Sequence, residues 1–146
     1  MNHEAPGVCA RDIRALIPHA GEMCLLDRIV EASDTELLCA TFSHRSPTNP
    51  LRRAGQLAAL HLAEYGAQTM AIHGGLESAG AAARGGMLVA IRGLRLQVAR
   101  LDDLDAELTI HVVKLAANAD GRIYSFTARA AQRELGTGRV SVMFVS

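Results

Sequence analysis

The residue placed most unusually for chemistry is Glu64, the only formally charged side chain within the otherwise apolar segment 56–73. His61 lies three residues before it and Gln68 four residues after it, so the three share one face if the segment is helical. A carboxyl group in an apolar cleft is suited to proton transfer, and Gln68 can orient it by a side-chain hydrogen bond. This pattern predicts an acid–base site on a helix.

Structural alternatives stay open for the same three residues. A buried carboxylate without partners costs several kcal/mol, so Glu64 must either be functional, pair with Arg92 or Arg95, or face a wet dimer seam. For His61 a surface pair with Glu64 on the helix is the favoured interpretation. Gln68 is explained equally by a hydrogen bond to a neighbouring backbone group.

The segment 56–73 is predicted to be the one long helix, ended by Gly74-Gly75. Because it has almost no polar face, it must be buried on nearly all sides. A short amphipathic helix is also expected over 10–17, where Pro18 stops it.

Most other segments alternate apolar and polar residues, which is typical of half-buried strands. Two of them form a predicted hairpin through a short turn, and a β-bulge at Gly93 restores the register of another. The predicted strands are 23–31, 36–43, 87–98, 104–112, 124–130 and 140–144. Curved strands of this kind can wrap around a helix, so the sequence predicts one α+β domain over 1–146 with the hot-dog fold. Its free edge strand is expected to be covered by dimerisation.

Composition excludes several classes of protein. The 15 basic and 15 acidic residues cancel, and the absence of Trp with only two Tyr and three Phe leaves no platform for nucleic acid. Three cysteines without a CxxC pair and six histidines without metal-ligand spacing indicate neither disulfides nor a metal. With no apolar leader and no membrane-length segment, we expect a cytoplasmic protein.

Two segments resemble a known family. LIPHAGEMCLLDRIVE (16–31) resembles the opening of bacterial 3-hydroxyacyl-carrier-protein dehydratases, and AEYGAQTMAIHGGL (63–76) resembles their central-helix signature, a Glu followed four residues later by Gln. The intervening HRSPTNPLRRAGQL (44–57) is most similar to the divergent branch associated with aryl-polyene biosynthesis. Together these segments cover residues 16–76.

The resemblance implies a dimeric hot-dog enzyme that removes water from a 3-hydroxyacyl thioester. No cofactor is implied beyond the phosphopantetheine arm of an acyl carrier protein, which would deliver the substrate. Glu64 matches the family carboxyl that protonates the departing hydroxyl. Backbone N–H groups at the helix start, around Leu57, Ala58 and Ala59, would hold the thioester oxygen.

The family base is a histidine in the loop before the helix, and here the sequence departs from the common form, which carries an HFPG loop. His44 is the only histidine in the loop 44–55 and lies 20 residues before Glu64. The usual separation falls near Asn49 instead, where an Asn-Pro turn is the simpler interpretation. An amide cannot accept a proton, so the base is missing if Asn49 occupies that position.

Arg45, Arg52 and Arg53 are either a solvated loop or a docking surface for an acidic carrier protein. Two other functions compete with dehydration. One is an acyl thioesterase, in which the helix carboxylate activates water. The other is a non-catalytic subunit that pairs with an active hot-dog dehydratase, which the missing HFPG loop favours.

Overall fold

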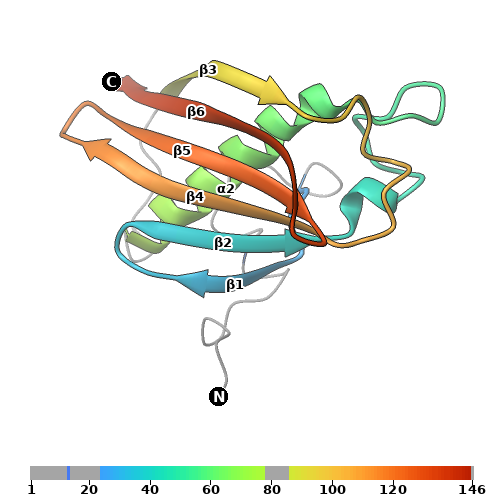
Figure 1. Ribbon diagram of the computed structural model, residues 1–146. Coiled ribbons are helices and arrows are strands. Elements are labelled where there is room, and N and C mark those ends of the chain that lie inside the picture. Colours follow the sequence, from blue (N-terminus) through green and yellow to red (C-terminus); the bar gives the residue numbers. More distant parts are fainter. Residues whose placement is uncertain (1–12, 14–23, 78–85, 146) are drawn as a thin grey trace.

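The computed structural model describes residues 13, 24–77 and 86–145. Six strands form one antiparallel sheet in the order β1-β2-β4-β5-β6-β3, and it curves around a single long helix, α2 (Figure 1). The strands are β1 (Arg28–Ala32), β2 (Glu36–Thr41), β3 (Gly86–Leu96), β4 (Leu108–Ala117), β5 (Gly121–Ala130) and β6 (Arg133–Val145). The helix α2 spans Leu62–Glu77, and two 3-10 turns, η2 (Ser43–Arg45) and η3 (Ala59–His61), precede it. This arrangement confirms the predicted hot-dog fold.

The helix is shielded along its whole length, as its composition requires. Half of its residues are buried, and only the last residue, Glu77, is exposed. Gly66 allows the closest approach to the sheet, because a Cβ added there would lie 2.8 Å from the ring of Phe126 on β5. The ring of Phe126 is 1% exposed and lies at the centre of the contact between helix and sheet.

Strand alternation follows the prediction in the second half of the chain. Tyr124, Phe126, Ala128 and Ala130 are all buried on the face of β5 that meets α2. The bulge is confirmed as well: the pairing of β3 with β6 shifts between Arg92 and Arg95, and Gly93 has a φ of +62°. A positive φ is strained for most other residues, which explains glycine there.

The start of the helix was predicted six residues too early. Residues 56–58 are extended, with Gln56 bridged to Arg53 and Ala58 bridged to Arg100. The loop after β3 takes the backbone groups that a helix would have used, since Leu101 N–H donates to Leu57 O at 2.8 Å. Apolar composition carries no signal of this pairing across more than 40 residues.

The end of the helix and several strand starts also differ from the prediction. Gly74-Gly75 does not end α2, because contacts of His73 and Glu77 with the sheet hold the last turn helical. The first strand starts at Arg28 rather than 23, and β4 starts at Leu108 rather than 104. The last two strands start earlier than predicted, β5 at Gly121 rather than 124 and β6 at Arg133 rather than 140. The short helix expected over 10–17 lies outside the described residues, apart from Ile13, which is helical and fully buried.

Candidate functional site

Glu64 and Gln68 are joined by a hydrogen bond on α2. The Nε2 of Gln68 donates to Oε2 of Glu64 at 3.1 Å, while Oε1 of Gln68 accepts from the backbone N–H of Leu25 at 2.9 Å. Because a backbone N–H can only donate, the oxygen of Gln68 must face Leu25 and its amino group must face Glu64. A buried amide with one possible orientation therefore positions the carboxyl.

Glu64 is half-buried on α2. It shares one side of the helix with Ala67 and Ala71, which are also half-buried and follow it at helical spacing. The alternative pairing with Arg92 or Arg95 is not formed, since those arginines line the opposite face of the sheet. The carboxyl is thus neither in bulk water nor neutralised by a strand arginine.

His61 is half-buried at the end of η3. Among the described residues it forms no hydrogen bond or ion pair with Glu64, so the predicted surface pair is not formed. Its place one turn before the carboxyl keeps it beside the candidate site.

Tyr65, the residue that follows Glu64, belongs to a chain of hydrogen-bonded polar side chains. The Oγ of Ser43 donates to Leu25 O at 2.6 Å, so the 2.8 Å contact between Ser43 and Tyr65 requires the Tyr65 hydroxyl to donate. The side-chain amino group of Asn49 donates one hydrogen bond to the Tyr65 oxygen at 3.3 Å and another to Ser43 O at 2.9 Å. Burial raises the pKa of Tyr65, so its hydroxyl stays protonated.

The side chain of Asn49 therefore uses its hydrogen-bonding groups to hold the loop together. Its Oδ1 accepts from the backbone N–H of Leu51 at 2.9 Å, which forms the turn expected for Asn-Pro, and both amino hydrogens are used by Ser43 and Tyr65. The amide cannot take a proton, so Asn49 does not act as the base.

His44 is enclosed, with a relative exposure of 0%. Its Nε2 lies 3.0 Å from Leu104 O and must carry the proton, because the carbonyl can only accept. The other nitrogen, Nδ1, is buried without a hydrogen-bond partner in the described part of the chain. Nothing in this arrangement gives a substrate access to the nitrogen that a base would use.

Burial of the imidazole lowers the pKa of His44, and this has a testable effect on stability. Below about pH 6.5 the unfolded chain binds a proton that the folded chain does not, so stability falls as the pH falls toward the lowered pKa. In His44→Gln the free energy of unfolding is expected to fall less steeply between pH 7 and about pH 5. The slope should differ from that of the native chain by less than roughly 1.4 kcal/mol per pH unit, the value for one full proton. Urea unfolding at several pH values measures it. Equal slopes for both proteins would contradict the enclosed position. The control is His111→Gln on β4, which removes a half-buried histidine.

The amides predicted to hold a thioester oxygen are mostly engaged already. Leu57 N–H donates to Oδ1 of Asp102 at 2.8 Å, and Ala59 N–H donates to Ala99 O at 2.9 Å. Ala58 is exposed, and its N–H takes part in neither of these two hydrogen bonds. The prediction was therefore wrong for Leu57 and Ala59, because the loop before β4 pairs with this segment.

Asp102 is the centre of that loop contact. Arg100 Nε lies 3.1 Å from Oδ1 of Asp102 and its Nη2 binds the other carboxylate oxygen. The guanidinium and the N–H of Leu57 hold the pKa of Asp102 well below its usual range. The carboxylate thus anchors the segment that leads into α2 at all but the most acidic pH.

The three loop arginines differ in their freedom. Arg45 donates to Asp102 O at 3.0 Å and lies 3.3 Å from Asp105, and Arg52 donates to the carbonyls of Gly55 and His44 at 3.0 Å each. Arg53 is exposed. Two of the three therefore brace the loop, and a role in carrier docking stays a prediction.

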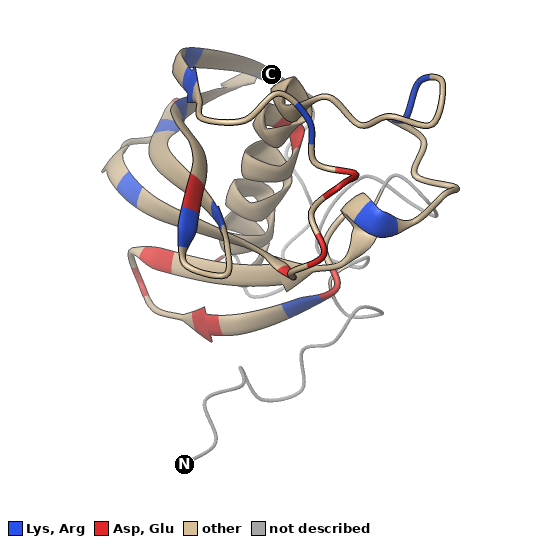
Figure 2. Cartoon of the chain, turned by 45° about the vertical axis from the view of Figure 1, so that its right-hand side comes forward, with Lys and Arg blue, Asp and Glu red and all other residues tan. Residues whose placement is uncertain are grey.

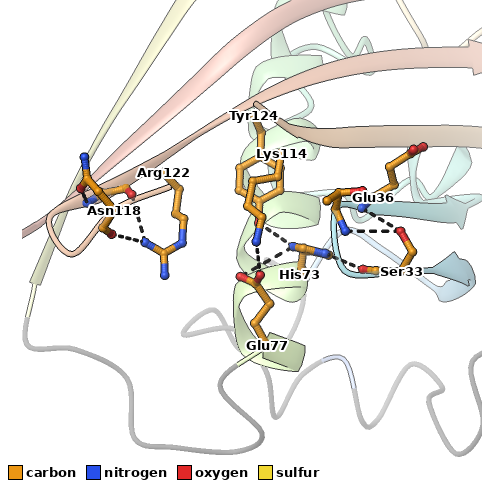
Figure 3. Close-up of polar contacts among 10 residues, drawn as sticks. Ser33, Glu36, His73, Glu77, Lys114, Asn118, Arg122 and Tyr124 are labelled. Atoms are coloured by element: carbon orange, nitrogen blue, oxygen red, sulfur yellow. Dashed lines mark hydrogen bonds and ion pairs between the residues drawn. The ribbon is translucent and has the colours of Figure 1, made fainter. Parts of the chain in front are cut away.

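A second polar cluster lies at the other end of α2 (Figure 3). Nε2 of His73 lies 2.8 Å from Ser33 O, so it carries the proton, and Nδ1 accepts from the Tyr124 hydroxyl at 2.5 Å. Glu77 lies 3.9 Å from the same ring and pairs with Lys114. His73 is 1% exposed, so this cluster ties the helix to the turn between β1 and β2, to β4 and to β5 rather than contacting a substrate.

Tyr124→Phe is expected to destabilise the fold by about 1 kcal/mol, because it leaves Nδ1 of buried His73 without its donor. Urea unfolding measures the loss. Ser125→Ala, on the opposite face of the same strand, should stay within about 0.5 kcal/mol. Equal stability of Tyr124→Phe and the native chain would show that the hydrogen bond is not made.

Sequence reasoning missed Leu25, Tyr65 and Asp102 as positioning residues. Tyr65 had a usable signal, because a phenol inside a buried helix needs a hydrogen-bond partner. Leu25 acts through its backbone and Asp102 through a contact 45 residues away in sequence, so no local pattern marks either.

Neither a metal centre nor a membrane span is found among the described residues. No group of three His, Cys, Asp or Glu side chains gathers closely enough there to hold a metal ion. Nor does any helix in those ranges combine the length and apolarity needed to cross a membrane.

Comparisons with solved structures place the fold among hot-dog proteins. The dehydratase heterocomplex ApeI:P from Xenorhabdus doucetiae matches with a TM-score of 0.80 and 21% identity over 92% of this chain and 91% of that one. Zebra fish thioesterase superfamily member 2 matches with a TM-score of 0.63 and 12% identity over 94% and 95% of the two chains. An HP0420 homologue from Helicobacter felis matches with a TM-score of 0.60 and 5% identity over 93% and 89%. At these identities the matches show the fold alone.

The search among curated proteins found no match. The model of the ApeP-like dehydratases (ApeP dehydratase) matches residues 11–145, which include both segments of the predicted resemblance and all of the described strands. This chain therefore belongs to the ApeP-like dehydratase family.

Proposed function

We propose that this chain is one subunit of a dehydratase that converts a 3-hydroxyacyl thioester, delivered by an acyl carrier protein, to the 2-enoyl thioester. The observation that carries the proposal is the pair of hydrogen bonds from Leu25 N–H to Gln68 and from Gln68 to Glu64. They hold a half-buried carboxyl in one position on α2, which is what a general acid for a departing hydroxyl requires.

The proposed reaction is a β-elimination. A base takes the proton on Cα, the electrons of that C–H bond form the Cα=Cβ bond, and the Cβ–O bond breaks. The departing hydroxyl takes a proton from Glu64 and leaves as water. Glu64 is reprotonated before the next turnover by the proton that the base gives up.

The base is proposed to come from a second hot-dog subunit. His44 is enclosed and its protonated nitrogen is bound by Leu104, and Asn49 has no lone pair for a proton. Glu64 is half-buried rather than enclosed, so a partner can approach it. The similar dehydratase from Xenorhabdus doucetiae is described as a heterocomplex, which supports a partner of a different sequence.

The test is a mass-spectrometric assay on a panel of 3-hydroxyacyl-carrier proteins. The chain is assayed alone and after co-expression with a second hot-dog dehydratase subunit. We expect loss of water with the pair and little or none with the chain alone. Release of free acid would instead assign a thioesterase, and full activity of the chain alone would overturn the need for a partner's base.

A further inference from the structure

A hollow of about 380 Å³ lies between β3, β5 and β6, and none of its lining residues belongs to the candidate acid–base site. Phe126 points toward α2, so its neighbours Ser125 and Thr127 point to the other face of the sheet. We propose that this outer hollow is a binding site for a small diphosphate-bearing anion. The proposal goes beyond the dehydratase function, because the sheet separates the hollow from Glu64.

Strand register gathers six polar side chains on this face. Arg139 is paired with Ser125 on one side and with Arg92 on the other. One step along, Thr137 is paired with Thr127 and with Arg95. Residues directly opposite each other in a sheet share a face, so three arginines and three hydroxyls form two adjacent rows.

The bulge in β3 is what makes this set possible. Arg92 and Arg95 are three residues apart, and in a regular strand they would point to opposite faces. The extra residue around Gly93, whose φ is +62°, lets them pair with Arg139 and Thr137, which are two residues apart and share a face. The positive φ of Gly93 thus places the guanidinium groups of both Arg92 and Arg95 at the hollow, beside that of Arg139.

The charge of this cluster is not neutralised. Among the described residues no carboxylate lies within ion-pair distance of Arg92, Arg95 or Arg139, and all three are exposed. Arg92 and Arg139 are directly opposite each other, which is unfavourable for like charges. The chain as a whole has no net charge, and Figure 2 shows acidic residues on the β1–β2 hairpin. An anion bound here would relieve the repulsion.

The lining also indicates the class of anion. Guanidinium groups bind phosphate oxygens through two parallel hydrogen bonds, and hydroxyls add further donors. The hollow is within the range of small-ligand sites and is larger than a single phosphate needs. Three positive charges with three hydroxyls therefore suit two linked phosphates, whether free or part of a nucleotide.

Isothermal titration calorimetry of the full chain with pyrophosphate and with ADP tests the site, with sulfate at equal ionic strength as the comparison. We expect saturable binding of pyrophosphate that weakens as salt is added. Arg139→Gln should weaken it about tenfold or more, because a charge-assisted hydrogen bond is lost. Tighter binding of ADP than of pyrophosphate would assign the hollow to a nucleotide, and equal binding would assign it to free diphosphate.

The matched control is Arg129→Gln, which removes an exposed arginine of β5 that does not line the hollow. It should change the affinity less than twofold. Arg95→Gln is a second lining variant if Arg139→Gln does not keep the native melting temperature. No saturable binding of either diphosphate, equal binding of sulfate, or an equal loss with Arg129→Gln would overturn the proposal.

Discussion

Glu64→Gln is expected to lower the rate of dehydration by roughly 10²- to 10⁴-fold, the usual contribution of a positioned general acid. The amide has almost the shape of the carboxyl and can still accept from Gln68, so the hydrogen bond between the two side chains is kept. What it lacks is a proton to give to the departing hydroxyl. The rate of 2-enoyl thioester formation by the assembled dehydratase, followed by mass spectrometry, measures the effect.

Glu31→Gln is the control for this substitution, because Glu31 is exposed on β1. It should leave the rate unchanged. Circular dichroism and the melting temperature of Glu64→Gln should match those of the native chain. A fully active Glu64→Gln protein would remove Glu64 from the mechanism.

Phe126→Ala is expected to cost about 3–5 kcal/mol of the free energy of unfolding, the range for deleting a fully buried aromatic ring. The ring fills the contact between β5 and α2, and a Cβ at either Gly66 or Gly138 would lie 2.8 Å from it. It is therefore held from two sides, and the surrounding chain cannot close the cavity easily. Urea unfolding measures the loss, and Ile123→Ala, at an exposed position of the same strand, should lose far less.

The reciprocal change tests the same contact. Gly66→Ala should cost about 1–3 kcal/mol in the native chain, because the ring has no room to move aside. In the Phe126→Ala background this cost should disappear. Gly74→Ala is the control on the same helix: a Cβ there meets nothing within 4 Å, so alanine should stabilise the helix by about 0.5–1 kcal/mol. Equal effects at the two glycines would contradict the close approach.

This contact also bears on the candidate site. Gly66 lies two residues after Glu64, so the depth at which α2 sits on the sheet sets how far the carboxyl lies from the groups that position it. Leu25, which holds Gln68, belongs to the segment that leads into β1. A change at Gly66 that keeps the fold should therefore lower activity as well as stability.

The contacts around residue 73 illustrate how far a local pattern can mislead. The glycines at 74 and 75 predict a helix end, yet α2 continues because His73, Glu77 and their partners on the sheet outweigh the local cost of glycine. The same holds at the other end, where Leu57 and Ala59 give their backbone groups to the loop that contains Asp102. In both places a tertiary contact overrides local propensity.

The sequence by itself determined that a long helix carries Glu64 in an apolar segment, and it determined the curved sheet and the bulge at Gly93. These follow from periodicity and from glycine's access to positive φ, both of which are properties of neighbouring residues along the chain. Only the tertiary structure decided that His44 faces Leu104, that Asn49 is bound by Ser43 and Tyr65, and that Gln68 is oriented by Leu25. Those outcomes depend on which groups meet across the fold, and hydrogen bonds between distant segments leave no periodic trace in the order of amino acids.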